Sequence, residues 1–308
     1  MPRSEPVDGF SLAYDRAGEG PPVVLLHGWP GDHGDHAALA GRLASSADVV
    51  VPDLRGFGAS DKHPVPAPEG YSAAAQARSV LGLLEELGLA SAVLAGYDVG
   101  SRVAQAVARE APDRVRALVV SPPLPGAGDR VLEPAAQTEF WYQPFHRLDL
   151  SAALLDGRPD AVRSYLRHFW THWSGPSFHP DDDHLDRLAA AYGAPGAFTA
   201  SIAWYRAGAG SVAASLAEKA PAPEDRVTVP TTVLWPEYDP LFPREWSDRI
   251  AVPLTALWPE HDPLFPLAWS DRLGAFFADV TLRRLPGAGH FTPLEATDAF
   301  AEAILQRL

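Results

Sequence analysis

The stretch Val93–Gln105, VLAGYDVGSRVAQ, combines a short apolar run, an aspartate between two glycines and an amphipathic continuation. Val93–Ala95 has the length and β-branched content of a buried strand, and Ser101–Glu110 has the apolar spacing of a helix. Asp98 stands in the pattern G-x-D-x-G, which suits a sharp turn between strand and helix. We therefore expect a nucleophile elbow that pushes Asp98 into a pocket. The alternative is an aspartate that only caps the helix.

The alternation of strand-like and helix-like segments extends along much of the chain. Apolar runs at Val23–Leu26, Val49–Val51 and Leu118–Val120 read as strands, and Tyr71–Leu87 reads as a helix with one apolar face. This order is typical of an α/β fold with a mostly parallel central sheet flanked by helices. The sequence therefore predicts one large α/β core.

The alternation stops between the strand at Leu118–Val120 and the strand-like run that begins at Thr231. The intervening segment is rich in aromatic residues and helical in its apolar spacing. We expect residues 122–220 to form an inserted helical cap, and residues 1–121 and 221–308 to form the core.

A tandem duplication lies near the end of the chain. Residues 229–250 and 252–273 match at 16 of 22 positions, and each copy offers a strand, an acidic loop and a short helical segment. Two copies are too few to stack into a solenoid. We interpret the repeat as a local duplication of one strand-loop-helix segment.

Composition narrows the classes of function. The chain has 308 residues, a formal net charge of −14 and no Cys, so a nucleic-acid partner, a thiolate metal site and a cysteine nucleophile are disfavoured. No apolar stretch reaches the ~18 residues of a membrane span, and a cytoplasmic, membrane-free protein is the simplest expectation. No glycine-rich nucleotide fingerprint follows a strand. We expect no cofactor and no metal.

Two further motifs flank the predicted elbow in chain order. His27-Gly28-Trp29-Pro30 follows the first strong strand, and Gly289-His290-Phe291 lies near the C-terminus. With these motifs the chain resembles the α/β-hydrolase superfamily over essentially its whole length. The aspartate at the elbow makes it similar to the branch that contains epoxide hydrolases, haloalkane dehalogenases and fluoroacetate dehalogenase.

This resemblance implies a two-step reaction that suits a carboxylate. A carboxylate is ionised at neutral pH and can displace a group at saturated carbon directly, which leaves an alkyl ester on Asp98. His290 would then activate water, and the backbone N–H groups of Trp29 and Val99 would stabilise the oxyanion. His27 is expected in the substrate pocket.

The acid that orients His290 has more than one candidate because its loop is duplicated. Asp262 precedes His290 by 28 residues and Asp239 precedes it by 51; the shorter interval resembles that of the family. We favour Asp262 and keep Asp239 as the alternative. Asp129, after the strand at Leu118–Val120, is a third candidate.

Two segments of the predicted cap favour one reaction over the other. Trp141-Tyr142-Gln143 and Trp204-Tyr205-Arg206 resemble the two tyrosine motifs of epoxide hydrolases. Tyr142 and Tyr205 would donate to the epoxide oxygen, with Trp141 and Trp204 beside the substrate. Dehalogenases of this branch place Trp or Arg after the nucleophile, whereas this chain has Val99.

The sequence thus predicts an epoxide hydrolase that forms a vicinal diol with water as co-substrate. The aromatic residues of the predicted cap favour a small apolar epoxide, including one that carries an aromatic ring. A haloalkane or haloacid dehalogenase with the same nucleophile is the alternative within enzymes, and a non-catalytic binding protein is the alternative outside them. The oligomeric state stays open, with a homodimer as one option.

Overall fold

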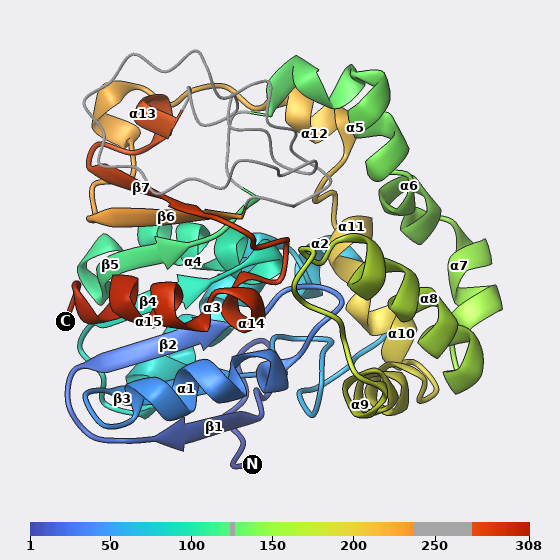
Figure 1. The fold of residues 1–308 in the computed structure, drawn as a ribbon, viewed down its shortest axis with the longest axis horizontal. Helices are drawn as coiled ribbons and strands as arrows, with labels where there is room; N and C mark the ends of the chain where they lie inside the picture. The colour runs from blue at the N-terminus through green and yellow to red at the C-terminus, as the bar shows by residue number, and fades with distance from the viewer. Residues whose placement is uncertain (124–126, 237–272) are drawn as a thin grey trace.

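A seven-stranded sheet forms the centre of the molecule. The computed structural model describes residues 1–123, 127–236 and 273–308. The strand order is β1-β3-β2-β4-β5-β6-β7; β1 is antiparallel to β3 and every other pair is parallel (Figure 1). The strands are β1 (Tyr14–Ala17), β2 (Pro22–Leu26), β3 (Asp48–Pro52), β4 (Ala92–Gly96), β5 (Val115–Val120), β6 (Thr231–Pro236) and β7 (Val280–Leu285). The predicted mostly parallel sheet is confirmed.

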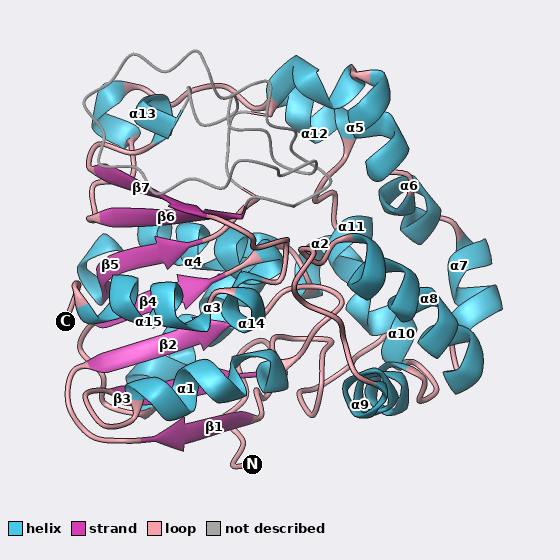
Figure 2. Cartoon of the chain, in the orientation of Figure 1, coloured by secondary structure: helices cyan, strands magenta, loops and turns pink. Residues whose placement is uncertain are grey.

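Helices cover both faces of this sheet. The core elements are η1 (His33–His36), α1 (Ala37–Leu43), α2 (Ala67–Gly70), α3 (Ala73–Glu86), α4 (Asp98–Glu110), η2 (Pro112–Arg114), α13 (Leu273–Phe276), α14 (Thr292–Glu295) and α15 (Thr297–Leu305). Figure 2 shows α1 and α15 in front of the strands, with α3 and α4 behind them. The helix predicted at 71–87 is therefore α3, and the one predicted from Ser101 begins earlier, at Asp98.

The alternation of side chains along each buried strand explains this layering. On β2, Val24 and Leu26 pack in the apolar cluster that contains Leu83 of α3, while Val23 and Leu25 pack on the opposite face with Ile304 of α15. Successive residues of a strand point to opposite faces, so a strand covered on both sides needs apolar residues throughout. This is why these strands read as continuous apolar runs.

A helical segment lies between β5 and β6, and we call residues 127–225 the helical insert. Its elements are η3 (Gly128–Leu132), α5 (Pro134–Glu139), α6 (Tyr142–Arg147), α7 (Asp149–Leu155), α8 (Pro159–His172), α9 (Asp182–Tyr192), α10 (Ala197–Ser201), α11 (Ala203–Arg206), α12 (Val212–Ala217) and η4 (Pro223–Asp225). The insert lies beside the carboxyl ends of the parallel strands, as Figure 1 shows. In α/β sheets this edge is where ligands bind.

Several predictions lie largely or wholly outside the described residues. Most of the duplication at 229–250 and 252–273 falls there; β6 and the preceding Val229 belong to the described part of the first copy. The division into core and cap stays a prediction. Within the residues that the structure describes, no helix has both the length and the apolar character required to cross a membrane.

Candidate active site

Asp98 sits at a strained turn between β4 and α4. Its φ angle is 48°, in the left-handed region that non-glycine residues rarely adopt, and its side chain is 11% exposed. A β-carbon on Gly100 would collide with the carbonyl oxygen of Leu26 at the end of β2, so only glycine allows this helix to approach the sheet so closely. Strain of this kind persists where the surrounding structure enforces it, which is common at reactive residues.

The loop after β2 contributes a hydrogen-bond donor to the Asp98 carboxylate. The backbone N–H of Trp29 donates to Oδ1 of Asp98 at 2.6 Å. Val99 is the second residue of α4, in the first turn, where backbone N–H groups have no acceptor within the helix. Of the two predicted oxyanion residues, Trp29 thus bonds this carboxylate through its N–H group, and Val99 follows Asp98 at the start of the helix.

His290 approaches the other oxygen of the same carboxylate. Its Nε2 lies 3.6 Å from Oδ2 of Asp98, and its side chain is 1% exposed. Its backbone N–H donates to the carbonyl oxygen of Trp173 at 2.8 Å, and the two rings are 5.1 Å apart between centroids. The chain thus brings the predicted nucleophile and base together although 192 positions separate them in the sequence.

A cavity of about 310 Å³ opens beside Asp98 and carries both predicted tyrosines. Its lining includes Asp98, Val99, Arg102, Tyr142, Trp204 and Tyr205. The rings of Tyr142 and Tyr205 meet edge to face at 5.6 Å between centroids. Burial raises the pKa of Tyr205 well above its ordinary range, as do the neighbouring Tyr142, which hydrogen-bonds to it, and the charge of Asp98. Tyr205 therefore keeps its proton at neutral pH.

Two residues predicted at the pocket lie elsewhere. Trp141 is 42% exposed, and its ring stacks on Phe169 at 5.9 Å between centroids. His27 is fully buried behind the Trp29 loop, where its Nε2 accepts a hydrogen bond from the backbone N–H of Leu54 at 3.0 Å. Neither is among the described residues that line the cavity. The Trp141 ring packs against another ring of the helical insert, and the His27 ring bonds the backbone of neighbouring loops.

The described residues do not assign the acid that orients His290. Asp262 and Asp239 lie outside the described residues, so their roles stay predictions. Asp129 is on η3 of the helical insert and exposed. Among the residues whose positions are given, no group of three His, Cys, Asp or Glu is arranged to hold a metal ion.

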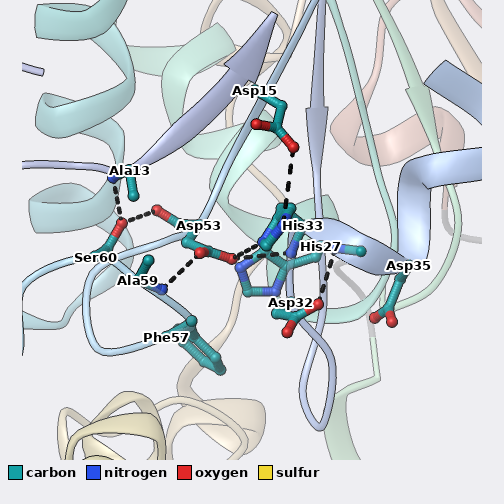
Figure 3. A network of polar contacts seen from close by, with 12 residues as sticks. Ala13, Asp15, His27, Asp32, His33, Asp35, Asp53, Phe57, Ala59 and Ser60 are labelled. Carbon is teal, nitrogen blue, oxygen red and sulfur yellow. Dashed lines mark hydrogen bonds and ion pairs between the residues drawn. The ribbon is translucent and has the colours of Figure 1, made fainter. Parts of the chain in front are cut away.

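Asp53, which is fully buried, lies at the centre of a network of polar contacts (Figure 3). Oδ1 of Asp53 accepts from both the backbone N–H and Nδ1 of His33 at 2.9 Å, and Oδ2 accepts from the N–H of Ala59 at 2.7 Å. Burial alone would raise the pKa of Asp53, but the hydrogen bonds and charge of His33 outweigh it and lower the pKa to about 2. Sequence reasoning did not identify His33 as the partner of Asp53.

A second group of contacts joins the helical insert to the same loop. Arg187 of α9 forms an ion pair with Asp32 and lies 3.5 Å from Oδ1 of Asp35. Tyr97, the neighbour of the elbow aspartate, donates its O–H to Oδ2 of Asp35 at 2.6 Å. Burial and the nearby Asp32 raise the pKa of Asp35 to about 7. Sequence reasoning missed these residues, because acidic residues after a strand usually cap a helix.

Comparisons with known proteins identify the family to which the fold belongs. Residues 21–297 match the family model described as the alpha/beta hydrolase fold. The soluble epoxide hydrolase of Corynebacterium sp. (strain C12) is 30% identical over 237 residues, which are 74% of this chain and 78% of that protein. Haloalkane dehalogenase 2 of Mycobacterium tuberculosis (strain CDC 1551 / Oshkosh) is 27% identical over 301 residues, 96% of this chain and 91% of its own length.

The crystal structure of Bacillus megaterium epoxide hydrolase in complex with an inhibitor shares the fold. Its TM-score is 0.76 at 18% identity, and the match covers 98% of each chain. The predicted resemblance to this superfamily, including its epoxide hydrolases and dehalogenases, is confirmed. The protein belongs to the α/β hydrolase fold family.

Proposed function

We propose that this hydrolase opens epoxides to vicinal diols through a covalent ester on Asp98. The observation that carries the proposal is the pair Tyr142 and Tyr205, whose side chains line the same cavity as the Asp98 carboxylate. An opening epoxide develops negative charge on its oxygen and needs a proton donor, whereas a departing halide needs none. Because the pKa of Tyr205 is raised, its hydroxyl stays protonated at neutral pH and can donate a hydrogen bond to that oxygen.

In the first step, a carboxylate oxygen of Asp98 attacks one epoxide carbon. The new C–O bond forms as the ring C–O bond breaks, and the ring oxygen takes a proton from Tyr205 or Tyr142. Oδ1 is engaged by the Trp29 N–H group, so we assign the attack to Oδ2. The product of this step is a hydroxyalkyl ester of Asp98.

In the second step, His290 removes a proton from water, and the resulting hydroxide adds to Cγ of the ester. The Trp29 N–H group already donates to Oδ1 and would stabilise the oxyanion on that atom. Collapse breaks the bond between Cγ and the ester oxygen, and the departing alkoxide takes the proton from His290 to give the diol. The proton that the added hydroxyl leaves on the Asp98 carboxyl returns to the tyrosinate, which restores the starting state. An acid, Asp262 in our proposal with Asp239 as the alternative, would hold the imidazole in the required tautomer.

Carbon–halogen hydrolysis by the same nucleophile is the second candidate, since the chain also resembles a haloalkane dehalogenase. Val99 follows Asp98 here, so the Trp or Arg that dehalogenases of this branch place after the nucleophile is missing. The test is a product assay with aryl and alkyl epoxides, haloalkanes and haloacetates, with Asp98→Ala as control. Diol from epoxides alone supports the proposal; halide release without diol overturns it.

A further inference from the structure

The loop that carries His290 has little regular structure of its own. It joins β7 to α14, and residues 286–291 belong to neither element. Backbone N–H groups in such a loop need acceptors from elsewhere. The position of the imidazole relative to Asp98 therefore depends on the groups that bond this loop.

One carboxylate supplies the acceptors on both sides of His290. Glu295, the last residue of α14, accepts from the N–H of Gly289 at 2.8 Å and from the N–H of Phe291 at 3.0 Å. These are the two residues on either side of His290. The N–H of His290 itself donates to the carbonyl oxygen of Trp173. Consecutive peptide groups around His290 are thus all bonded.

The same carboxylate also bonds the helical insert. The N–H of Gly175, just beyond the end of α8, donates to Oε2 of Glu295 at 2.7 Å. A β-carbon on Gly289 would collide with the backbone nitrogen of Gly175, so the two segments are in direct contact. Next to this contact, the rings of Trp170 and Phe291 stack at 3.6 Å between centroids. Glu295 therefore joins the histidine loop to the segment that lies over it.

We propose that Glu295 is a positioning residue for His290: its carboxylate binds three converging N–H groups and thereby sets the imidazole for the hydrolytic half-reaction. This inference rests on the two-step function proposed above. Charge-assisted bonds of this kind are stronger than neutral ones. Glu295 acts through the loop and contacts neither Asp98 nor the cavity among the described residues. Ester formation at Asp98 does not require it.

Glutamine cannot replace this carboxylate, because three donors converge on two oxygens and Oε2 accepts two of them. In Glu295→Gln, one end of the side chain becomes an NH₂ group that faces an N–H donor. We expect ester hydrolysis to slow by about 10- to 100-fold, the range that follows from a misplacement of ~1 Å. The rate of ester formation should stay within about 3-fold of wild type.

The experiment follows both half-reactions by quenched mixing with a substrate, intact-protein mass spectrometry of the ester and product release. Glu302→Gln is the matched control, since Glu302 is 63% exposed on α15 and pairs only with Arg283 and Gln306 among the described residues. Glu295→Gln should accumulate ester, while Glu302→Gln should behave as wild type. If both half-reactions of Glu295→Gln fall equally, or neither changes, the proposal is wrong.

Two further variants keep the outcome interpretable. If Glu295→Gln does not fold, Glu295→Asp, which keeps the charge on a shorter side chain, should show the same selective loss of hydrolysis to a smaller degree. Equal loss in both steps would again overturn the proposal. His290→Gln separates this inference from the proposed function. If His290→Gln retains an ester adduct and Glu295→Gln does not, only the role of Glu295 is refuted. If His290→Gln gives no epoxide adduct, the epoxide assignment is refuted. The effects of Glu295→Gln on ester formation and on ester hydrolysis are then measured with the halide substrate.

Discussion

Nε2 of His290 lies 3.6 Å from Oδ2 of Asp98, while the N–H group of Trp29 bonds Oδ1 of the same carboxylate. The separation exceeds that of a normal hydrogen bond. Hydrolysis of an Asp98 ester requires a base near one carboxyl oxygen and a hydrogen-bond donor to the other, and His290 and Trp29 meet these two requirements. The geometry therefore suits the second step of the proposed reaction as well as the first.

The tyrosine pair should control ring opening. We expect Tyr205→Phe to slow ester formation by about 10- to 100-fold, and the double variant with Tyr142→Phe to approach the full ~10²–10⁴-fold contribution of a general acid. Hydrolysis of the ester should change far less. Rapid-quench mass spectrometry measures both steps. Tyr14→Phe on the distant strand β1 is the control, and an equal effect of that variant would contradict the assignment.

The pH dependence of ring opening tests the protonation of Tyr205. Its pKa is raised well above the ordinary value of about 10, so the hydroxyl stays protonated where a free phenol would ionise. The rate of ester formation should therefore stay level from about pH 7 to about pH 10. A decline with a midpoint below that of a free phenol would show that another group donates the proton.

The duplicated loop gives a prediction about the orienting acid. Asp262→Asn should largely abolish hydrolysis of the ester, while Asp239→Asn should leave turnover within a few-fold. The reason is that the interval from Asp262 to His290 resembles that of the family and the longer one does not. Steady-state turnover with accumulation of the ester checks this. The reverse pattern would assign the role to Asp239.

The hydrogen-bond network around Asp53 should contribute to the free energy of unfolding. Asp53→Ala removes a buried acceptor of three hydrogen bonds and should lower the free energy of unfolding by about 2–4 kcal/mol. The Asp53 pKa is about 2, so its contribution is present above the ordinary carboxyl value and lost as pH falls toward 2.

Part of the stability that Asp53 contributes depends on His33 being protonated, and this part is lost at high pH. Asp53 raises the pKa of His33, so the part that depends on protonated His33 is lost as pH rises through that pKa. The difference between wild type and Asp53→Ala should be largest near about pH 5 and smaller near about pH 9. Urea unfolding at each pH measures it, and a difference that grows with pH would be inconsistent. Exposed Asp113→Ala should have little effect at any pH.

The strands and the elbow could be predicted because both depend on local sequence. A strand covered on both faces must be apolar throughout, and the pattern G-x-D-x-G marks the turn at Asp98 even though the collision that requires glycine at position 100 is with Leu26 of another strand. Strand β1 was not predicted: it is an edge strand whose burial pattern is mostly exposed, so it lacks the apolar run. Edge strands carry a weak signal for this reason.

The residues that support the site were harder to predict because they act across long separations. Glu295 bonds Gly175 from 120 positions away, and Arg187 pairs with Asp32 from 155. A single sequence gives no sign of which charged residues will meet. The predicted place of Trp141 beside the substrate stays a prediction: its ring packs on Phe169, and the residue is 42% exposed. A motif fixes the residue type but not the direction of its side chain.

The most direct test of the central claim is intact-protein mass spectrometry of His290→Gln after incubation with epoxides, haloalkanes and haloacetates in separate reactions. Without the base, the second step should stall and the ester should remain on Asp98. We predict a mass gain equal to the whole epoxide, absent when Asp98→Ala is added. A gain equal to a halide substrate minus HX, with no epoxide adduct, would contradict the account and identify a dehalogenase. No adduct from any substrate would contradict covalent catalysis by Asp98 on these classes and favour a binding protein.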